Sequence, residues 1–410
     1  MAELLSPAGN FEKMKAAIRY GADAVYMAGQ IFGMRAAADN FTIEEMREAV
    51  KYAHERNVKV YLAVNTMVRE YDYPKLEQYF EDIKYVGLDA LIVADLGVMS
   101  VAKKVIPDID FHISTQANTV SSATCREWQR LGASRVVLAR ELTMEEIRMI
   151  RKNIPDTLEL EAFIHGSMCV SYSGRCLLSN YLIGRDANRG MCAQPCRWNY
   201  KIVERDYDLI EEKRPDIPIP VREINGETFI MSSKDMCMIE HVPELMESGI
   251  NSFKIEGRMK SAYYTAVVTN AYRMAMESYK SGKYEYNPLW LRELESVSHR
   301  EYSTGYFFDR SEEEAKVCSD TGYLREKSYL ATVLSYNEET KEALMMQKNK
   351  VSLNDKIEVL SPMKVGVAMQ VCELYNEAHE PIESAPHAQM KFFMKMPFEV
   401  KEGDIVRSGG

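Results

Sequence analysis

Short apolar runs alternate with amphipathic segments over the first 260 residues of the chain. The amphipathic segments, for example residues 11–21, 42–57 and 143–154, space their apolar side chains by three and four, as a helix with one buried face requires. The apolar runs are typical of short buried strands and lie at Glu3–Leu5, Ala24–Met27, Val58–Val64, Ala90–Val93, Phe111–Ser114, Arg135–Leu138, Leu158–Phe163 and Ser252–Ile255.

The number of these units decides the fold class. Alternating strands and helices imply a parallel sheet. Eight such units predict an α/β protein with a (β/α)8 TIM-like barrel, although an open doubly wound sheet is the alternative that the alternation also allows. Thr42 with Glu45, and Thr143 with Glu146, have the spacing of capping boxes and mark two of the expected helix starts.

An insertion interrupts the seventh unit. The chain between Phe163 and Ser252 is far longer than one connecting helix needs, and the excess, about residues 164–231, holds a cluster of cysteines. Residues 206–226 are rich in charge and proline, which predicts a loop or hairpin, and residues 232–249 predict the helix that completes the unit. Because loops after barrel strands build the active site, we expect the cysteines to lie at the barrel mouth.

The hydrophobic pattern changes in the last part of the chain. From about Tyr323 onwards, short alternating strands are separated by turn residues, which predicts a small C-terminal β-barrel over 323–410. The first domain is then expected to comprise residues 1–322, in which 261–322 form connecting helices after the barrel.

Four of the eight cysteines follow a C-x6-C-x15-C-x3-C spacing, at Cys169, Cys176, Cys192 and Cys196. Four thiolates can hold an iron–sulfur cluster or a structural zinc ion. A zinc ribbon would require two tight C-x2-C knuckles, so the spacing favours a larger and softer centre. Four buried or free cysteines, or zinc, remain alternatives, and Cys237 could replace Cys196 as the fourth ligand.

Polar residues at the expected carboxyl ends of the strands are candidates for substrate binding and catalysis. We expect Arg140, Glu256 and Arg258 to be catalytic. Arg140 and Arg258 are the best candidates for binding an anionic substrate, because a guanidinium pairs bidentately with a carboxylate or phosphate. A structural salt bridge is the alternative for each of them. The other polar strand ends are Asn65, Asp95, Gln116, Glu141, Glu161 and His165.

Composition and charge restrict the partners. Hydrophobic residues make up 46% of the chain and charged residues 27%, as in ordinary globular enzymes, and the net charge is −10. RNA contact would therefore require a local basic patch, for which the candidates are Arg175, Arg185, Arg189 and Arg197 in the insertion and Lys348, Lys350 and Lys356 in the C-terminal domain. The N-terminus lacks the features of a signal peptide and no apolar stretch is long enough to span a bilayer, so we expect a cytoplasmic protein without a membrane partner.

Familiar hydrolase signatures are absent from the sequence. It contains no H-E-x-x-H zinc motif, no G-x-S-x-G nucleophile elbow and no G-x-x-x-x-G-K-[ST] phosphate loop. No C-x3-C-x2-C motif of radical S-adenosylmethionine enzymes occurs either.

Three long segments, residues 4–29, 161–198 and 253–273, closely resemble the peptidase U32 family, first described as collagenase-like. The resemblance extends over nearly the whole chain. It implies a barrel with a 4Fe–4S cluster held by Cys169, Cys176, Cys192 and Cys196. It also implies oxygen-independent hydroxylation of a substrate, which in different members is transfer RNA, 23S ribosomal RNA or the ubiquinone ring. The length and the trailing β domain are most similar to the tRNA-hydroxylating branch.

For that branch the resemblance implies formation of 5-hydroxyuridine at the wobble position of tRNA, with prephenate as the small carboxylate donor of the hydroxyl group. It also allows a homo-oligomer or a hetero-oligomer with a family paralogue. Two other functions stay open: a collagenase-like peptidase, for which the sequence offers no recognisable nucleophile, and a cluster-bearing accessory subunit without turnover of its own.

Overall fold

The structure is a computed structural model. It describes residues 2–34, 39–169, 171, 176, 178–195, 233–308, 324 and 326–409, together with the backbone of four short strands of the insertion, Leu209–Glu211 (β8), Arg214–Ile219 (β9), Arg222–Ile224 (β10) and Glu227–Phe229 (β11). Of the strands in the insertion, β8 pairs with β9 and β10 with β11, each in antiparallel fashion.

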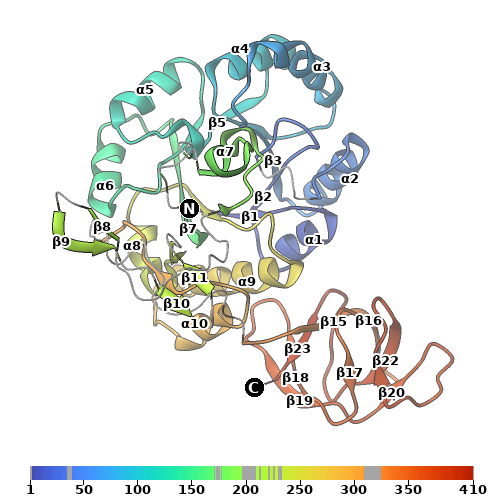
Figure 1. The fold of residues 1–410 in the computed structure, drawn as a ribbon. Coiled ribbons are helices and arrows are strands. Elements are labelled where there is room, and N and C mark those ends of the chain that lie inside the picture. The colour runs from blue at the N-terminus through green and yellow to red at the C-terminus, as the bar shows by residue number, and fades with distance from the viewer. Residues whose placement is uncertain are drawn as a thin grey trace.

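Eight parallel strands close into a barrel, which confirms the predicted fold class and excludes the open sheet (Figure 1). The closure is direct, because the last strand pairs with the first at Leu5 and Lys254 and with the seventh at Glu161 and Ser252. The strands are β1 (Glu3–Pro7), β2 (Ala24–Met27), β3 (Lys59–Val64), β4 (Ala90–Val93), β5 (Asp110–Ile113), β6 (Arg135–Val137), β7 (Glu159–Ser167) and β13 (Ser252–Ile255).

Helices surround the barrel and bury their apolar faces against the strands (Figure 1). Both predicted capping boxes are present: the Thr42 and Thr143 side chains accept from the backbone of Glu45 and Glu146, whose carboxylates accept in return. The ring contains α1 (Phe11–Arg19), α2 (Ile43–His54), α3 (Tyr73–Ile83), α4 (Leu96–Val105), α5 (Ser122–Arg130), α6 (Met144–Lys152), α8 (Val242–Met246) and α9 (Ala262–Lys280), with 3-10 turns at Glu70–Asp72 (η1), Thr115–Ala117 (η2) and Ile239–His241 (η5). Helix α10 (Pro288–Glu295) packs against α9.

The helix predicted over 232–249 is wrong in its first half. Residues Asp235–Cys237 form strand β12, which pairs antiparallel with the end of β7, Cys237 lying opposite His165. A short strand, β14 (Tyr302–Ser303), pairs with the other edge of β12. Strand β7 continues beyond the barrel and offers its backbone groups to these residues, so sheet pairing outweighs the local helical pattern.

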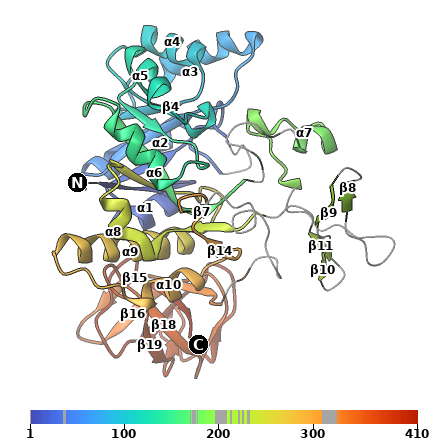
Figure 2. The ribbon, with the colours of Figure 1, turned by 90° about the vertical axis from the view of Figure 1, so that its left-hand side faces the viewer.

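The insertion lies at the end of the barrel where the strands terminate. Its described part includes α7 (Leu178–Ile183) and the 3-10 turn η3 (Ala187–Arg189), and both α7 and β8–β11 project from the side opposite the chain's N-terminus (Figure 2). The described part of the insertion therefore lies at the carboxyl ends of the barrel strands, as predicted, although most of its central part lies outside the described residues.

The C-terminal domain is an antiparallel half-barrel sheet, which confirms the predicted small β domain. It has its own core, which includes Val333, Met345, Ile357 and Phe392. The sheet order is β19 (Val367–Gln370), β18 (Lys356–Leu360), β23 (Ile405–Ser408), β15 (Tyr329–Asn337), β16 (Glu342–Gln347), β22 (Lys391–Lys395) and β20 (Leu374–Tyr375), and a separate pair joins β17 (Val351–Ser352) to β21 (Ser384–Ala385).

This half-barrel packs on the flank of the barrel, beside α1, α9 and α10, and leaves the mouth open (Figures 1 and 2). The buried Arg407 of β23 donates to both carboxylate oxygens of Glu293 on α10, at 2.6 and 2.7 Å. Tyr20, the C-cap residue of α1, donates to the Leu360 carbonyl at 2.8 Å. The predicted boundary at residues 322 and 323 falls outside the described residues and stays a prediction. No helix in the described part is both long and apolar enough to cross a membrane.

Candidate active site at the barrel mouth

A pocket opens at the carboxyl ends of the barrel strands, with an empty volume of about 500 Å³ that includes its open mouth. Successive residues of a strand point to opposite faces, so every second strand residue faces the barrel axis. The pocket is lined by Tyr26, Met34, Ala63, Asn65, Ile92, Ser114, Thr115, Gln116, Val137, Arg140, Phe163, Lys254, Glu256 and Arg258.

The three residues predicted to be catalytic, Arg140, Glu256 and Arg258, all line this pocket. Arg140 lies 3.8 Å from the Glu256 carboxylate and donates to the Ser167 carbonyl at 2.8 Å. Its guanidinium also stacks over the ring of Phe163, 4.0 Å from the ring centre. The Arg140 Nε is buried and makes no hydrogen bond within the described residues. The structure thus brings the three together, and their catalytic role stays a prediction.

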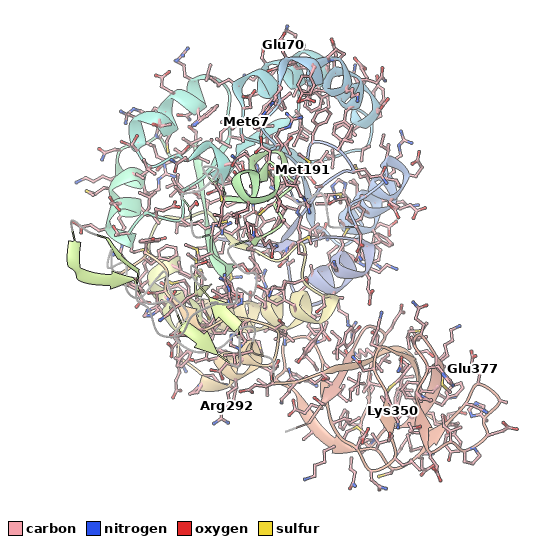
Figure 3. All side chains as sticks on the ribbon, in the orientation of Figure 1. Met67, Glu70, Met191, Arg292, Lys350 and Glu377 are labelled. Atoms are coloured by element: carbon pink, nitrogen blue, oxygen red, sulfur yellow. The ribbon has the colours of Figure 1, made fainter. Side chains whose placement is uncertain are left out.

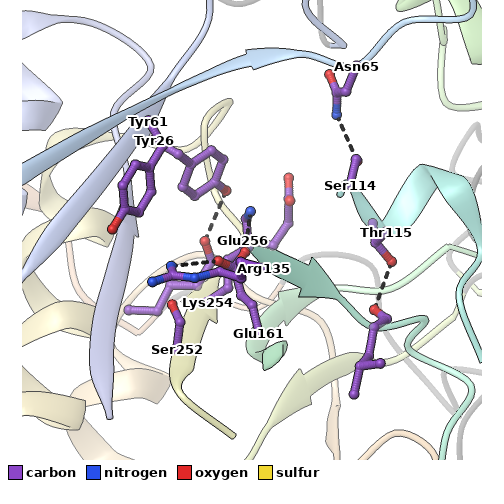
Figure 4. Close-up of polar contacts among 12 residues, drawn as sticks. Tyr26, Tyr61, Asn65, Ser114, Thr115, Arg135, Glu161, Ser252, Lys254 and Glu256 are labelled. Atoms are coloured by element: carbon purple, nitrogen blue, oxygen red, sulfur yellow. Dashed lines mark hydrogen bonds and ion pairs between the residues drawn. The ribbon is translucent and has the colours of Figure 1, made fainter. Parts of the chain in front are cut away.

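The remaining polar strand ends divide into two groups. Asn65 and Gln116 also line the pocket, and the Asn65 amide donates to Ser114 at 3.3 Å (Figure 4). Asp95 instead caps α4 by accepting from the Val98 amide. Glu141 is outside the pocket lining, Glu161 lies below it, and His165 packs behind the barrel wall against Tyr272 of α9.

Sequence reasoning missed Lys254, which lies on the floor of the pocket. Its ammonium donates to Glu161 Oε1 at 2.7 Å and lies 4.5 Å from the ring centre of Tyr26. The signal was available in the pattern of β13, where Ser252, Lys254 and Glu256 alternate with Phe253 and Ile255. In a strand buried on both sides, such alternation indicates a polar face that points into the barrel.

A network of buried charges continues beneath Lys254 (Figure 4). Arg135 donates to Glu3 at 2.7 Å and to Glu161 at 3.2 Å, and Tyr61 donates to Glu3 at 2.6 Å. Burial alone would raise the pKa of Glu3, but the charge and hydrogen bonds of Arg135 outweigh it and keep that pKa below its usual value. Glu3 is therefore held ionised, and the interior of the barrel is charged on this side.

The other half of the barrel interior is apolar. Strands β1 to β4 fill it with a compact cluster that includes Leu5, Ala24, Tyr26 and Ile92. The pocket floor thus lies between an apolar wall and a charged wall. Of its lining residues three are cationic, Arg140, Lys254 and Arg258, and one is acidic, Glu256, so it favours an anionic ligand.

Three of the four predicted cluster cysteines are described, and Cys196 lies outside the described residues. Cys169 is exposed, while Cys176 and Cys192 are partly exposed. The backbone amide of Gln194 donates to the Cys192 sulfur at 3.3 Å. Hydrogen bonds of this kind tune the electronic properties of a thiolate that binds a metal. Within the described residues, however, no three histidine, cysteine, aspartate or glutamate side chains converge as metal ligands.

Cys237, the alternative fourth ligand, is buried in β12. Burial raises the pKa of its thiol to about 12, which keeps it protonated. The Tyr272 hydroxyl donates to its sulfur at 4.0 Å. Cys237 is therefore a core residue of this structure and a poor thiolate donor.

The loops that carry Cys176 and Cys192 are tied to each other and to the barrel. The side-chain amide of Asn188 donates to the Cys176 carbonyl at 3.1 Å. The Ser179 hydroxyl accepts a hydrogen bond from the backbone amide of Ala193 at 3.1 Å. The backbone amide of Met67, in the loop after β3, donates to the Asn188 carbonyl at 3.0 Å and so ties the insertion to the barrel (Met67 is labelled in Figure 3).

Arg189, predicted as an RNA contact, braces the insertion against the barrel. It donates to Asp72 at 2.8 Å and to the Met67 carbonyl at 3.0 Å, and its contact with RNA stays a prediction. Arg185 donates to the Met191 carbonyl within the insertion. In the C-terminal domain Lys348 pairs with Glu12 at 2.7 Å, while Lys350 and Lys356 are exposed. Arg175 and Arg197 lie outside the described residues.

Comparison with known proteins identifies the family. The model of peptidase family U32 matches residues 9–316, and that of the peptidase family U32 C-terminal domain matches residues 325–407. Tyr323 begins the predicted C-terminal domain, two residues before the second match.

Three relatives match over most of their length. The tRNA hydroxylation protein P1 of Bacillus subtilis (strain 168) is 34% identical over 409 residues, which cover 99% of this chain and 94% of the relative. The tRNA hydroxylation protein P of Escherichia coli (strain K12) is 35% identical over 396 residues, covering 88% and 86%. A collagenase of Porphyromonas gingivalis is 30% identical over 401 residues, covering 94% and 93%.

Proposed function

The chain belongs to peptidase family U32, and we propose that it is an RNA-modifying hydroxylase that acts on tRNA. The observation that carries this proposal is the similarity to tRNA hydroxylation proteins along both domains, at 34% identity over 99% of the chain in one case. The cationic pocket at the carboxyl ends of the strands supports it, because the substrate and a small acidic donor would both be anionic.

The proposed reaction replaces the C5 hydrogen of the wobble uridine with a hydroxyl group, without molecular oxygen. Prephenate would supply the oxygen as hydroxide, the C5 hydrogen would leave as a proton, and the two electrons of this oxidation would pass to an external electron acceptor. The anticodon is single-stranded, so its base can turn out of the stack and enter an open pocket. Arg140 and Arg258 would hold a carboxylate of the donor, as guanidinium groups do bidentately. Glu256, 3.8 Å from Arg140, would orient that guanidinium.

We further propose a 4Fe–4S cluster on Cys169, Cys176, Cys192 and Cys196. The spacing of the cysteines, the exposure of the three described thiols and the amide that donates to the Cys192 sulfur support it. When bound, the cluster would supply a redox or Lewis-acid centre near the mouth. Since the described thiols do not converge as a ligand set, we derive no step of the reaction from it.

Mass spectrometry of tRNA nucleosides tests the activity. A strain that lacks the gene is expected to lose 5-hydroxyuridine and its derivatives, and the wild-type gene to restore them. Arg140→Met is expected to restore at most a tenth of the modified fraction, because a charge-assisted contact is lost. Arg126→Met, on the exposed face of α5, is the matched control and should restore it fully. Unchanged uridine modification in the deletion strain would refute the proposal.

Iron analysis tests the cluster independently. Protein purified without oxygen should be brown and contain about four irons per chain. Cys192→Ala is expected to lose most of this iron, because a thiolate ligand is removed. Cys237→Ala is the matched control: its thiol is buried and protonated, so the iron should stay. Stoichiometric zinc without iron, or iron loss only in the Cys237 variant, would contradict the assignment.

The similarity to a collagenase favours a peptidase as the second candidate. In the described residues the histidine beside the mouth, His165, is buried, and its pKa is lowered to about 3 by burial. His165 does not line the pocket at the barrel mouth, so it cannot activate a hydroxyl or thiol nucleophile there. Incubation of the purified protein with gelatin separates the two candidates, and cleavage that Arg140→Met leaves intact would point to a separate peptidase site.

A further inference from the structure

We propose that Lys254 binds a carboxylate oxygen of the small acidic co-substrate on the pocket floor, and that Glu161 and Arg135 position its ammonium group. The inference rests on the proposed function for the identity of the co-substrate. It adds a substrate contact below Arg140 and Arg258, and assigns a role to the buried charges beneath the pocket.

The register of the strands places Lys254 between two layers of the barrel. Ser252, one inward position below, donates to Glu3 at 2.8 Å, whereas Glu256, one inward position above, lines the pocket. Lys254 belongs to both layers, because it lines the pocket and also contacts Glu161. A small molecule that passes Arg140 and Arg258 at the strand ends therefore meets Lys254 on the floor.

The ammonium group of Lys254 can donate more hydrogen bonds than it makes within the described residues. It carries three N–H groups, and in the described part of the chain one of them is used, by Glu161 at 2.7 Å. Its other close neighbours are the ring faces of Tyr26 and Phe163, 4.5 and 5.4 Å from the nitrogen. Rings attract the cation but accept no strong hydrogen bond, so two donors remain for an oxygen in the pocket.

Glu161 is built to hold this ammonium in place. Its side chain is completely buried, and its two oxygens are divided between Lys254 and Arg135. Arg135 is fixed in turn by Glu3 and by Glu159, which it contacts at 2.6 Å. The carboxylate therefore cannot turn away without breaking both contacts, and Lys254 is fixed before any ligand arrives.

Stability alone does not account for this arrangement. Burying paired charges costs desolvation energy that well-packed apolar residues would avoid, so such networks contribute little net stability. A fixed ammonium in a site shielded from water, by contrast, binds an anionic oxygen strongly because no reorganisation is needed. The charged residues line one side of the interior beneath the pocket, and the apolar residues of β1 to β4 line the opposite side.

The ligand is a carboxylate of a free small molecule rather than a phosphate of the RNA. Lys254 is 4% exposed and lies below the strand-end arginines, so it is reached only from inside the pocket. A free acid can descend to it, whereas the phosphates of a tRNA are joined to a chain that stays outside. Prephenate and uridine monophosphate serve as probes that distinguish the two sources.

Calorimetric titration of the full-length protein tests the contact. Lys254→Met is expected to raise the Kd for prephenate roughly 10- to 100-fold, the usual effect of losing a hydrogen bond between charged groups. Lys59→Met, which removes an exposed lysine at the opposite end of the barrel, should leave the Kd unchanged. Lys254→Gln, which keeps an uncharged donor to Glu161, replaces the methionine variant if that protein does not fold by circular dichroism.

A double-mutant cycle tests the positioning role of Glu161. Glu161→Gln should weaken prephenate binding in the wild-type background and add no further loss in the Lys254→Met background, because Glu161 acts through Lys254. A residue with a merely structural role would lower affinity equally in both backgrounds, which would overturn this part of the inference.

Three results would overturn the Lys254 contact: no prephenate binding by the wild-type protein, equal binding by Lys254→Met, or weakened binding of uridine monophosphate alone. None of these depends on turnover. Failure of the wild-type gene to restore 5-hydroxyuridine in the deletion strain, by contrast, would refute the proposed function while the titrations still report on Lys254.

Discussion

Burial sets the protonation state of single residues beside the site. His165 is 1% exposed, and burial lowers its pKa to about 3. It is therefore neutral at physiological pH, and neither a general acid nor a ligand for an anion. Cys237, its partner across the strand pair, stays a thiol for the same physical reason. Two residues beside the mouth that would be reactive in water are thus inert core residues here.

The pKa of His165 predicts how stability depends on pH. Below pH 6.5 the unfolded chain takes up a proton on this histidine, whereas the folded chain does not until about pH 3. The free energy of unfolding should therefore fall as the pH drops through this window, by up to about 1.4 kcal/mol per pH unit for one proton. Urea unfolding of the wild type and of His165→Gln between pH 7 and 5 measures the difference.

For His165→Gln, the free energy of unfolding should depend less steeply on pH than for the wild type, by the contribution of one proton. His112, whose pKa burial also lowers well below the usual value, adds a similar slope to both proteins and cancels in the comparison. His54→Gln, at an exposed position on α2, serves as the control. Equal slopes for the wild type and His165→Gln would show that His165 is charged or accessible in the folded protein.

At the scale of elements, a partly buried junction between η3 and η1 fastens the described part of the insertion to the barrel. Arg189 of η3 pairs with Asp72 of η1, and its hydrogen bonds lower the pKa of that carboxyl group. Gly190 follows with a φ of 85°, and a Cβ there would lie 2.9 Å from the Gly33 carbonyl oxygen. The backbone of the insertion and that of the barrel therefore touch at this point.

Loss of the Arg189 contact should loosen the insertion. Arg189→Met is expected to raise hydrogen exchange of the Met67 amide, which donates to the Asn188 carbonyl, roughly 10-fold, because a charge-assisted hydrogen bond is removed. Mass spectrometry of peptides that cover residues 64–72 measures it. The control is Arg69→Met, whose pair with Asp186 crosses the same junction but is exposed and 3.6 Å long. An equal effect of both variants would contradict the special role of Arg189.

At the scale of the whole molecule, Arg407 joins the two domains. It is 1% exposed and contacts Glu293 of the barrel domain and Glu358 of its own sheet. Arg407→Met leaves the Glu293 carboxylate buried without its cation, whereas Glu358 keeps Lys327, so the free energy of unfolding should fall by about 3–5 kcal/mol. Arg292→Met, on the exposed side of the same helix, should change it by less than about 0.5 kcal/mol (Figure 3).

Urea denaturation followed by tryptophan fluorescence and circular dichroism measures this prediction. The two signals should coincide for the wild type and separate for Arg407→Met, because the domains are then less strongly coupled. A change in stability no larger than that of Arg292→Met would show that the ion pair does not hold the domains together.

Local patterns in the sequence determined the larger part of the fold. Strands such as Ala24–Met27 and Ala90–Val93 begin and end where the apolar runs do, because a buried strand must be apolar on both faces. Thr42 and Thr143 start helices because their hydroxyl groups satisfy free amides that lie three residues away. The polar ends Arg140, Glu256 and Arg258 converge because a closed barrel collects the ends of all its strands.

Tertiary structure decided what depends on contacts between distant segments. Residues 235–237 became a strand because the extension of β7 offered them hydrogen bonds, which no local pattern records. Arg189 pairs with Asp72, more than a hundred positions away in the sequence. Lys254 is a pocket residue only because the strand that carries Glu161 lies beside its own in the closed barrel. Helix and strand propensities depend on residues close in the sequence, so they can be predicted from it. Ion pairs and strand partners depend on which segments lie close in space, which only the folded structure shows.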